Sequence, residues 1–323
     1  MAHKSVGNWA VLVELLESRP ELLGASRSAN LALARGFREA EQESFEVPIQ
    51  ATIVPLRTRW MGQPEVEVRI GRRVYSFVID TGADMTVLAS DVASACGVGP
   101  IGDCVGEAET STSQTIGVRP AVVPELRVGS IVVKHHPVAI VDRDDLTFGV
   151  VGLPLVRIRG ILGWHFVRRM VVELDFDRNR VVLDRPRGEG RDGVTRNLFW
   201  LGYPMVHLFG PGEESLLFGL DTGAQKTTLK IRAVEKLNLP FKMREGVSIG
   251  AGGGESVAQR EVKDLVLRLG HHELYFDKIR SSSGVKAAKI VEPDGRLGID
   301  VARSGGIRID YPSGRIDLLS DRL

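Results

Sequence analysis

One seven-residue motif occurs twice in this chain, and the repeat constrains the fold more than any other feature of the sequence. Phe77-Val78-Ile79-Asp80-Thr81-Gly82-Ala83 returns as Phe218-Gly219-Leu220-Asp221-Thr222-Gly223-Ala224. Each copy brings an apolar run to an Asp-Thr-Gly-Ala turn, and the register between the copies continues without a gap well beyond the motif. Similarity that keeps its register in this way indicates two copies of one structural unit.

Further matches extend the repeat through most of each copy. They are Thr86–Leu88 with Thr227–Leu229, Gly97 with Asn238, Leu126–Gly129 with Leu267–Gly270, Leu162-Gly163 with Leu297-Gly298, Leu174–Phe176 with Ile309–Tyr311, and Leu183 with Leu318. The spacing between the copies shortens after Gly129, which predicts one shorter loop in the second copy. Gly97 and Asn238 are both residue types that end helices by tolerating the left-handed conformation.

The local patterns predict a mostly β protein with a helical N-terminal extension. Apolar residues recur at helical spacing in residues 1–45, from Val11 to Phe37. After Ser44 the chain alternates short Val/Ile/Leu-rich segments with Gly, Pro and Asp turns, which is typical of strands and hairpins. The strands expected most clearly are Glu65–Ile70, Tyr75–Ile79, Ile131–Val133, Val171–Phe176 and Arg180–Leu183, and a short helix is expected in each copy at Ser90–Cys96 and Ile231–Leu237.

A polar, glycine-containing stretch, Arg185–Arg196, separates the two copies and is interpreted as a linker. We therefore expect three parts: a helical extension over residues 1–45, a first lobe over 46–190 and a second lobe over 191–323.

The two Asp-Thr-Gly turns predict a specific chemistry. If the copies pack about a pseudo-twofold axis, equivalent residues meet at that axis and Asp80 faces Asp221. Two carboxyls roughly 3 Å apart cannot both ionise easily, so they share one proton. One can then act as general base on a water molecule while the other donates a proton to a carbonyl oxygen. The hydroxyls of Thr81 and Thr222 are expected to form hydrogen bonds across the axis, and Gly82 and Gly223 to permit the tight backbone.

These residues resemble the retropepsin-like aspartic peptidases. The resemblance lies in the two motifs above and in Gly160-Ile161-Leu162-Gly163 and Gly295-Arg296-Leu297-Gly298 downstream, and it covers about residues 50 to 320. It implies two retropepsin-like β-barrel lobes related by pseudo-twofold symmetry and fused in one chain, as in pepsins. It also implies an aspartic endopeptidase that hydrolyses peptide bonds with Asp80 and Asp221, with Thr81, Gly82, Ala83, Thr222, Gly223 and Ala224 supporting the turns.

The resemblance further implies β-hairpin flaps over the cleft. In the second lobe Gly250, Ala251, Gly252, Gly253 and Gly254 suit a mobile hairpin tip that binds substrate, whereas Gly106–Ser111 of the first lobe contains one glycine and no Tyr. Flap closure is therefore expected to be asymmetric.

Two departures from the family pattern carry physical consequences. Ala83 and Ala224 stand where pepsins carry Ser or Thr, so a hydrogen-bond donor to the carboxylates is missing and a pH optimum less acidic than a pepsin's is expected. Arg296 stands where an apolar residue is usual, which raises a question about local packing.

Other functions are disfavoured by the composition and spacing. A formal net charge of +1 gives no field to attract nucleic acid or an anionic membrane. The glycine run at 250–254 is not followed by the residues of a phosphate loop. His135-His136 and His271-His272 are interpreted as surface hairpin residues, and no metal or cofactor is expected. Cys96 and Cys104 are expected to be reduced, and the lack of a signal peptide or membrane span favours the cytoplasm.

Three questions stay open at the level of sequence. The chain could be a catalytically silent peptide-binding or scaffold module of the same fold, although both Asp residues are present. Each lobe could instead pair with its twin in another chain, although a monomer is expected to suffice for activity on peptide or protein substrates. Residues 1–45 could be a packing extension or a regulatory segment that covers the cleft.

Overall fold

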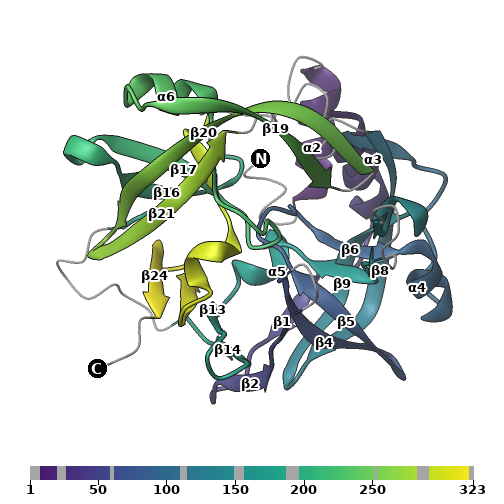
Figure 1. The fold of residues 1–323 in the computed structure, drawn as a ribbon. Coiled ribbons are helices and arrows are strands. Elements are labelled where there is room, and N and C mark those ends of the chain that lie inside the picture. The colour runs from purple at the N-terminus through teal and green to yellow at the C-terminus, as the bar shows by residue number, and fades with distance from the viewer. Residues whose placement is uncertain are drawn as a thin grey trace.

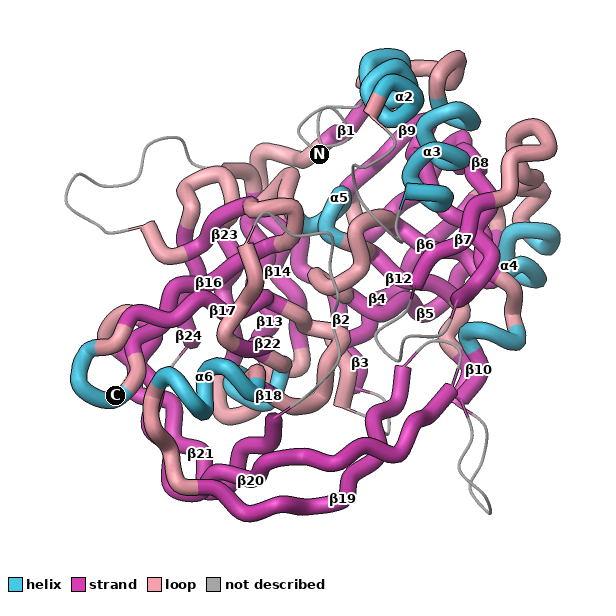
Figure 2. The backbone as a smooth tube through the Cα atoms, turned by 90° about the horizontal axis from the view of Figure 1, so that it is seen from above, coloured by secondary structure: helices cyan, strands magenta, loops and turns pink. Residues whose placement is uncertain are grey.

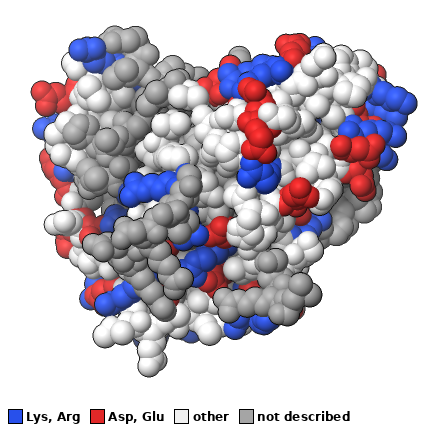
Figure 3. All heavy atoms as spheres, turned by 90° about the vertical axis from the view of Figure 1, so that its left-hand side faces the viewer, with Lys and Arg blue, Asp and Glu red and all other residues white. Residues whose placement is uncertain are grey.

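The computed structural model describes residues 8–19, 27–58, 62–109, 115–148, 156–186, 196–250, 253–281 and 291–319. The protein is mostly β, with two mixed sheets that form two lobes and with helices at the N-terminus (Figure 1). Among the described residues, no helix is both long enough and apolar enough to cross a membrane. Acidic and basic side chains are interspersed over the face seen in Figure 3.

The first lobe is a mixed sheet with the strand order β1-β9-β6-β12-β5-β4-β8-β7, and β3 pairs with β4. Its strands are β1 (Ser44–Glu46), β3 (Arg57–Thr58), β4 (Pro64–Ile70), β5 (Arg73–Ile79), β6 (Thr86–Ala89), β7 (Gly106–Glu109), β8 (Thr115–Val128), β9 (Ile131–Val141) and β12 (Gly160–Leu162). Helices α4 (Ser90–Ala95) and α5 (Trp164–Val167) follow β6 and β12.

The second lobe is a mixed sheet with the order β15-β16-β17-β22-β18-β21-β20-β19. Its elements are β15 (Leu198–Trp200), β16 (Pro204–Phe209), η3 (Pro211–Glu213), β17 (Ser215–Leu220), β18 (Thr228–Leu229), α6 (Ile231–Lys236), β19 (Phe241–Gly250), β20 (Gly253–Leu269), β21 (His272–Ser281), β22 (Gly295–Leu297) and η4 (Ile299–Ala302). The long β19–β20 hairpin leaves this lobe and crosses to the side of the first lobe (Figures 1 and 2).

A third sheet joins the two halves of the chain. Its order is β2 (Thr52–Pro55), β14 (Arg180–Asp184), β13 (Val171–Asp175), β23 (Gly306–Asp310) and β24 (Arg315–Leu319). Strands β13 and β23 pair antiparallel along their whole length, from Val171 opposite Asp310 to Asp175 opposite Gly306. Apart from this sheet, β10 (Thr147–Phe148) and β11 (Val156–Arg157) form a small pair beside η2 (Asp144–Leu146).

The core places a buried phenylalanine under each Asp-Thr-Gly turn. Phe77 of β5 and Phe218 of β17 are both fully buried, and one continuous apolar cluster contains the two. Each ring lies directly against a glycine, because a Cβ at Gly160 would overlap the distal ring carbons of Phe77 and one at Gly295 would overlap those of Phe218. The glycines that begin β12 and β22 therefore let these strands approach β5 and β17.

The N-terminal helices α2 (Trp9–Ser18) and α3 (Arg27–Phe37) pack onto the first lobe. Leu33 and Phe37 of α3 share an apolar cluster with Met85 and Ala139 of the lobe. Next to this helix the Gly106 backbone comes so close that a Cβ there would lie 2.6 Å from the Cα atom of Ala29. The first-lobe hairpin β7–β8 is therefore supported by α3 on one side.

Most expected elements are present within the described residues. The strands and short helices occur at the predicted places to within a residue or two, except that β9 extends far beyond Ile131–Val133. Gly97 and Asn238 end their helices with positive φ angles of 70° and 48°. Within the described residues the extension contains the helices α2 and α3, but residues 44–46 form β1, which pairs with β9 and so adds a strand to the first lobe. Cys96 and Cys104 are free thiols.

One prediction about histidines is wrong. His136 was expected at the surface, yet it is completely buried, because β9 carries it on the inner face while His135 faces outward. His271 and His272 lie at the β20–β21 turn, exposed and half-buried respectively.

Candidate active site

The two Asp-Thr-Gly-Ala segments fold into matching turns at the ends of β5 and β17. Parallel pairing of β5 with β12, and of β17 with β22, brings a carbonyl to each turn. The N–H group of Asp80 donates to the carbonyl oxygen of Leu162 at 3.0 Å, and that of Asp221 donates to the carbonyl oxygen of Leu297 at 3.0 Å. Both aspartates are thus fixed at a strand end by the same backbone contact.

Thr81 and Thr222 link the two turns by reciprocal hydrogen bonds. The N–H of each threonine donates to the Oγ1 atom of the other at 3.0 Å. In addition, Thr81 Oγ1 donates to the carbonyl of Leu220 at 3.0 Å, and Thr222 Oγ1 donates to the carbonyl of Ile79 at 2.7 Å. Both side chains are buried. Each hydroxyl satisfies a donor and an acceptor of the opposite turn, so the turns hold each other in place.

The glycines of the motif bring the two carboxyls into one site. A Cβ at Gly82 would lie 2.7 Å from Asp221 Cγ, and one at Gly223 would lie 2.6 Å from Asp80 Oδ1. Each turn therefore passes directly against the carboxyl of the other, where only glycine leaves room. Backbone N–H groups orient the carboxyls, since Gly82 donates to Asp80 Oδ1 at 2.8 Å and Ala224 donates to Asp221 Oδ1 at 2.9 Å.

The electrostatics of this site favour a shared proton. Burial, followed by repulsion from the charge of Asp221, raises the pKa of Asp80 to about 7, although the N–H of Gly82 opposes the change. A carboxyl with this pKa holds a proton over most of the acidic range. The pair can therefore present one acid and one base at the same time.

Two further side chains cross between the lobes at this site, and the sequence analysis missed both. Gln63 precedes Pro64 at the start of β4 and donates from Nε2 to the carbonyl of Gly223 at 3.1 Å. Tyr203 precedes Pro204 at the start of β16, and its hydroxyl would lie 2.9 Å from a Cβ at Gly82. Burial and then the charges of Asp221 and Asp80 raise the pKa of Tyr203 well above its usual value, so this hydroxyl is a neutral donor. In the sequence both residues precede a strand-opening proline, but this position by itself does not indicate a contact with the opposite lobe.

Arg296, noted in the sequence as a departure, reaches the same site. Its Nη1 atom lies 3.5 Å from Asp221 Oδ2, with the arginine side chain 25% exposed and the aspartate side chain 15% exposed. The Nε atom of Arg296 is buried and has no hydrogen-bond acceptor within the described part of the chain. Arg296 therefore places a cation beside Asp221, whereas no ion pair to Asp80 is present in the part of the chain that the structure describes.

The expected flap residues fall partly within the structure. Gly250 ends β19 and pairs with Gly253 at the start of β20, while Gly254 pairs with Ile249. Ala251 and Gly252, at the tip, lie outside the described residues, as do Thr110 and Ser111 of the first-lobe hairpin. Gly106 to Glu109 form β7 beneath α3.

A second cluster of titratable groups joins the N-terminal segment to the first lobe. Glu43 contacts the ring nitrogens of His136 and His165 at 2.5 and 2.9 Å and accepts from Arg169 at 2.7 Å. His136 also contacts Thr86 Oγ1 at 2.8 Å. Three ligand atoms of Glu43, His136 and His165 lie within 4.8 Å of one another, as a metal site requires. Because Arg169 already neutralises the carboxylate, a metal ion would compete with these hydrogen bonds.

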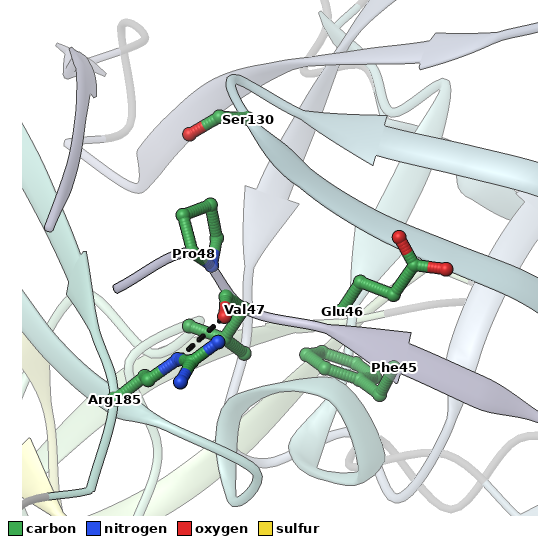
Figure 4. Close-up of a pocket in the computed structure, with 6 residues that line it drawn as sticks. All are labelled: Phe45, Glu46, Val47, Pro48, Ser130 and Arg185. Atoms are coloured by element: carbon green, nitrogen blue, oxygen red, sulfur yellow. Dashed lines mark hydrogen bonds between the residues drawn. The ribbon is translucent and has the colours of Figure 1, made fainter. Parts of the chain in front are cut away.

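A surface pocket of about 580 Å³ lies elsewhere, around β1 and the end of β14 (Figure 4). It is lined by Phe45, Glu46, Val47, Pro48, Ser130 and Arg185. Arg185 closes one side by donating from Nε to the carbonyl of Val47 at 2.6 Å. Because the pocket contains none of the residues of the two turns, it is not the site defined by the aspartates.

Comparison with known proteins agrees with this chemistry for part of the chain. A family model described as aspartyl protease matches residues 66–166, which include the Asp80 turn and Gly160–Gly163. No curated protein matches the chain. The class that the first lobe resembles is therefore the aspartyl proteases.

Proposed function

We propose that this protein is an aspartic endopeptidase that hydrolyses peptide bonds in peptide or protein substrates between Asp80 and Asp221. We further propose that residues 46–190 and 191–323 are duplicated lobes that form a pseudo-dimer, with residues 1–45 as an extension. The observation that carries the proposal is the mutual contact of the two turns, in which each glycine adjoins the opposite carboxyl and each threonine binds the opposite backbone.

In the proposed reaction the pair carries one negative charge and one proton. The ionised carboxyl removes a proton from a water molecule, whose oxygen attacks the substrate carbonyl carbon, while the protonated carboxyl donates to the carbonyl oxygen. The resulting gem-diol collapses when the C–N bond breaks and the leaving nitrogen receives a proton. Hydrogen bonds from Gly82 and Ala224 keep both carboxyls oriented throughout. The β19–β20 hairpin, including Gly250, Ala251, Gly252, Gly253 and Gly254, is proposed as the flap over the substrate.

The test is cleavage of a mixed peptide library by the full chain from pH 3 to pH 8. Asp80→Asn and Asp221→Asn are each expected to lower kcat/KM by about 10²–10⁴-fold, the usual contribution of a catalytic acid or base. Asp142→Asn, which alters an exposed carboxylate of the first lobe, serves as the matched control and should cleave normally. Loss of activity in only one of the two site variants would contradict a shared pair. A folded wild type that cleaves nothing would favour a peptide-binding module.

A pH profile gives a second test of the same site. Because the pKa of Asp80 is raised to about 7, the proton needed for catalysis persists well above the range of an exposed carboxyl. We expect kcat/KM to fall on the alkaline side with a midpoint near pH 7 and not to peak below about pH 3. A maximum below pH 3 would show that the pair titrates like a pepsin's despite Ala83 and Ala224.

A further inference from the structure

The two halves of the site differ most clearly at one position. In the first lobe Ile161 pairs with Val78 of β5 and Val87 of β6. In the second lobe Arg296 occupies the corresponding place, opposite Gly219 of β17 and Thr228 of β18. An apolar side chain on one side and a guanidinium on the other break the symmetry that the two turns otherwise keep.

The guanidinium acts on one carboxyl. Its Nη1 atom is 3.5 Å from Asp221 Oδ2, and both side chains are mostly shielded from water. At this distance and depth, attraction between the charges is stronger than at an open surface. Among the described residues, Asp221 forms an ion pair with a cation and Asp80 does not, so the negative charge is more stable on Asp221 than on Asp80.

The other ionisable groups around the cluster do not cancel this bias. Asp80 and Asp84 contribute negative charge from the first lobe, and Tyr203 is neutral. Lys230, which precedes α6, has its pKa lowered by burial and also by repulsion from Arg296 and Arg232, against attraction to Glu292. Arg232 is paired with Glu292 and Asp294, so Lys230 and Arg296 are the cations that act on each other on the second-lobe side of the site.

We propose that Arg296 is a positioning residue that fixes the charge of the pair on Asp221 and leaves the shared proton on Asp80. This proposal rests on the proposed function for its catalytic consequence. Asp221 then takes the proton from the attacking water, and Asp80 protonates the carbonyl oxygen. When the C–N bond breaks, Asp221 returns its proton to the leaving nitrogen, and Asp80 recovers one from the gem-diol. The raised pKa of Asp80 agrees with this division of roles.

The first experiment compares pH profiles of kcat/KM for wild type, Arg296→Ile and Arg296→Lys. Isoleucine is the residue that the first lobe carries at the corresponding position, so the substitution makes the two halves alike. Without the cation the negative charge is less stable, and the acidic limb should move up by about one pH unit or more. Lysine keeps the charge and should keep the limb near that of wild type.

Arg268→Ile is the matched control. This arginine belongs to the same lobe but contacts Glu213 and the ring of Phe209 instead of the pair. Its removal should leave the profile unchanged. An unchanged acidic limb in Arg296→Ile would overturn the proposal, as would a variant whose only change is a lost preference for acidic peptide side chains.

A measurement independent of turnover separates this proposal from the proposed function. Aspartate carboxyl groups can be titrated by 13C NMR in wild type and Arg296→Ile, with Asp80→Asn and Asp221→Asn used to assign the signals. An ionisation at Asp221 that moves to higher pH in Arg296→Ile supports the role of Arg296, even if the wild type cleaves no peptide and the proposed function fails. Identical titrations in both proteins would overturn it.

Discussion

At the residue scale, Thr81 and Thr222 carry hydrogen bonds on which both turns depend. Replacing Thr81 by Val keeps the shape but removes the hydroxyl, which leaves the carbonyl of Leu220 and the N–H of Thr222 buried without a partner. Two unsatisfied groups should cost about 2–4 kcal/mol in the free energy of unfolding. Urea unfolding of Thr81→Val and Thr81→Ser measures the difference, since Ser retains the hydroxyl. Equal loss in both variants would argue that methyl packing matters more than the hydrogen bonds.

Asp80 also links stability to pH. Its pKa rises from 3.8 to about 7 on folding, through burial first and then repulsion from Asp221. The folded state therefore binds this proton more tightly than the unfolded state, and the contribution is fully present below about pH 4 and lost as the pH rises through 7. Asp80→Asn cannot ionise, so its stability relative to wild type should increase by about 2–4 kcal/mol between pH 4 and pH 8.

Urea unfolding of both proteins at the two pH values checks this prediction. Asp142→Asn is again the control, because that carboxylate is exposed. If wild type and Asp80→Asn lose stability in parallel between pH 4 and pH 8, Asp80 does not hold its proton as inferred.

Some residues of the site can be recognised from the sequence repeat, whereas others are recognised only once the fold is known. Asp80 and Asp221 could be selected from sequence because equivalent residues meet at a pseudo-twofold axis. Gln63 and Tyr203 could not, because they lie in turns before β4 and β16 and reach the opposite lobe. The sequence showed that Arg296 departs from the family pattern. That its side chain reaches Asp221 depends on which face of β22 lies toward the turn, and the sequence does not give this.

At the element scale, Glu43 anchors the N-terminal segment to the first lobe. Burial disfavours the ionised form of Glu43 and by itself raises its pKa. Hydrogen bonds from His136 and His165 outweigh this effect and hold the pKa of Glu43 well below its usual range. Burial lowers the pKa of His165 to about 4, against the attraction of Glu43. Glu43→Gln loses the charge that faces Arg169 and should lower the free energy of unfolding by about 1–3 kcal/mol at pH 7.

The difference in the free energy of unfolding between wild type and Glu43→Gln should shrink only when the pH falls below about 4.5. Because the pKa of Glu43 is lowered on folding, its contribution is present above the unfolded-state value of 4.5 and is lost as the pH falls below it. His165 does not reduce the difference, because burial, which both proteins share, is the main cause of its lowered pKa. Chemical unfolding at several pH values measures this trend. Glu41→Gln is the control, because Glu41 meets His135 at an exposed position, 78% of its side chain being accessible. Equal destabilisation by Glu43→Gln and Glu41→Gln would show that the buried cluster around Glu43 stabilises the fold no more than the exposed pair of Glu41 and His135.

Element types followed from periodicity, but their partners did not. The alternation of apolar residues was enough to predict β4, β5, β13 and β14, and the helical spacing was enough to predict α2 and α3. The docking of α3 against β7 and β8, and the pairing of β1 with β9, depend on contacts between distant parts of the chain. The same holds for the inward-facing His136, which a strand longer than expected carries into the core.

At the scale of the whole molecule, the third sheet is the feature that connects the halves. Strand β13 from the first half and β23 from the second pair directly, and β14 and β24 extend the sheet on either side. The matching segments Leu174–Phe176 and Ile309–Tyr311 were recognised in the sequence as repeats, but the pairing of the strands that carry them was not predicted. Leu174 lies opposite Ile307, and Ile309 lies opposite Val172. This strand pairing gives a reason for the two turns to meet within one chain.

Internal pairing of the lobes makes a clear prediction about mixtures. Asp80→Asn and Asp221→Asn each retain one intact turn, so exchange of lobes between two chains would rebuild some complete Asp80–Asp221 pairs. Because β13 and β23 join the lobes of one chain over five paired positions, from Val171–Asp310 to Asp175–Gly306, we expect no exchange. Equimolar mixing of the two inactive variants, including refolding them together from urea, should therefore give no activity above that of either alone. Dilution of the wild type should leave its specific activity unchanged, since a pair formed within one chain does not depend on concentration. Activity that appears on mixing, or a wild type that loses specific activity on dilution, would instead place the two carboxyls of a working site on separate chains.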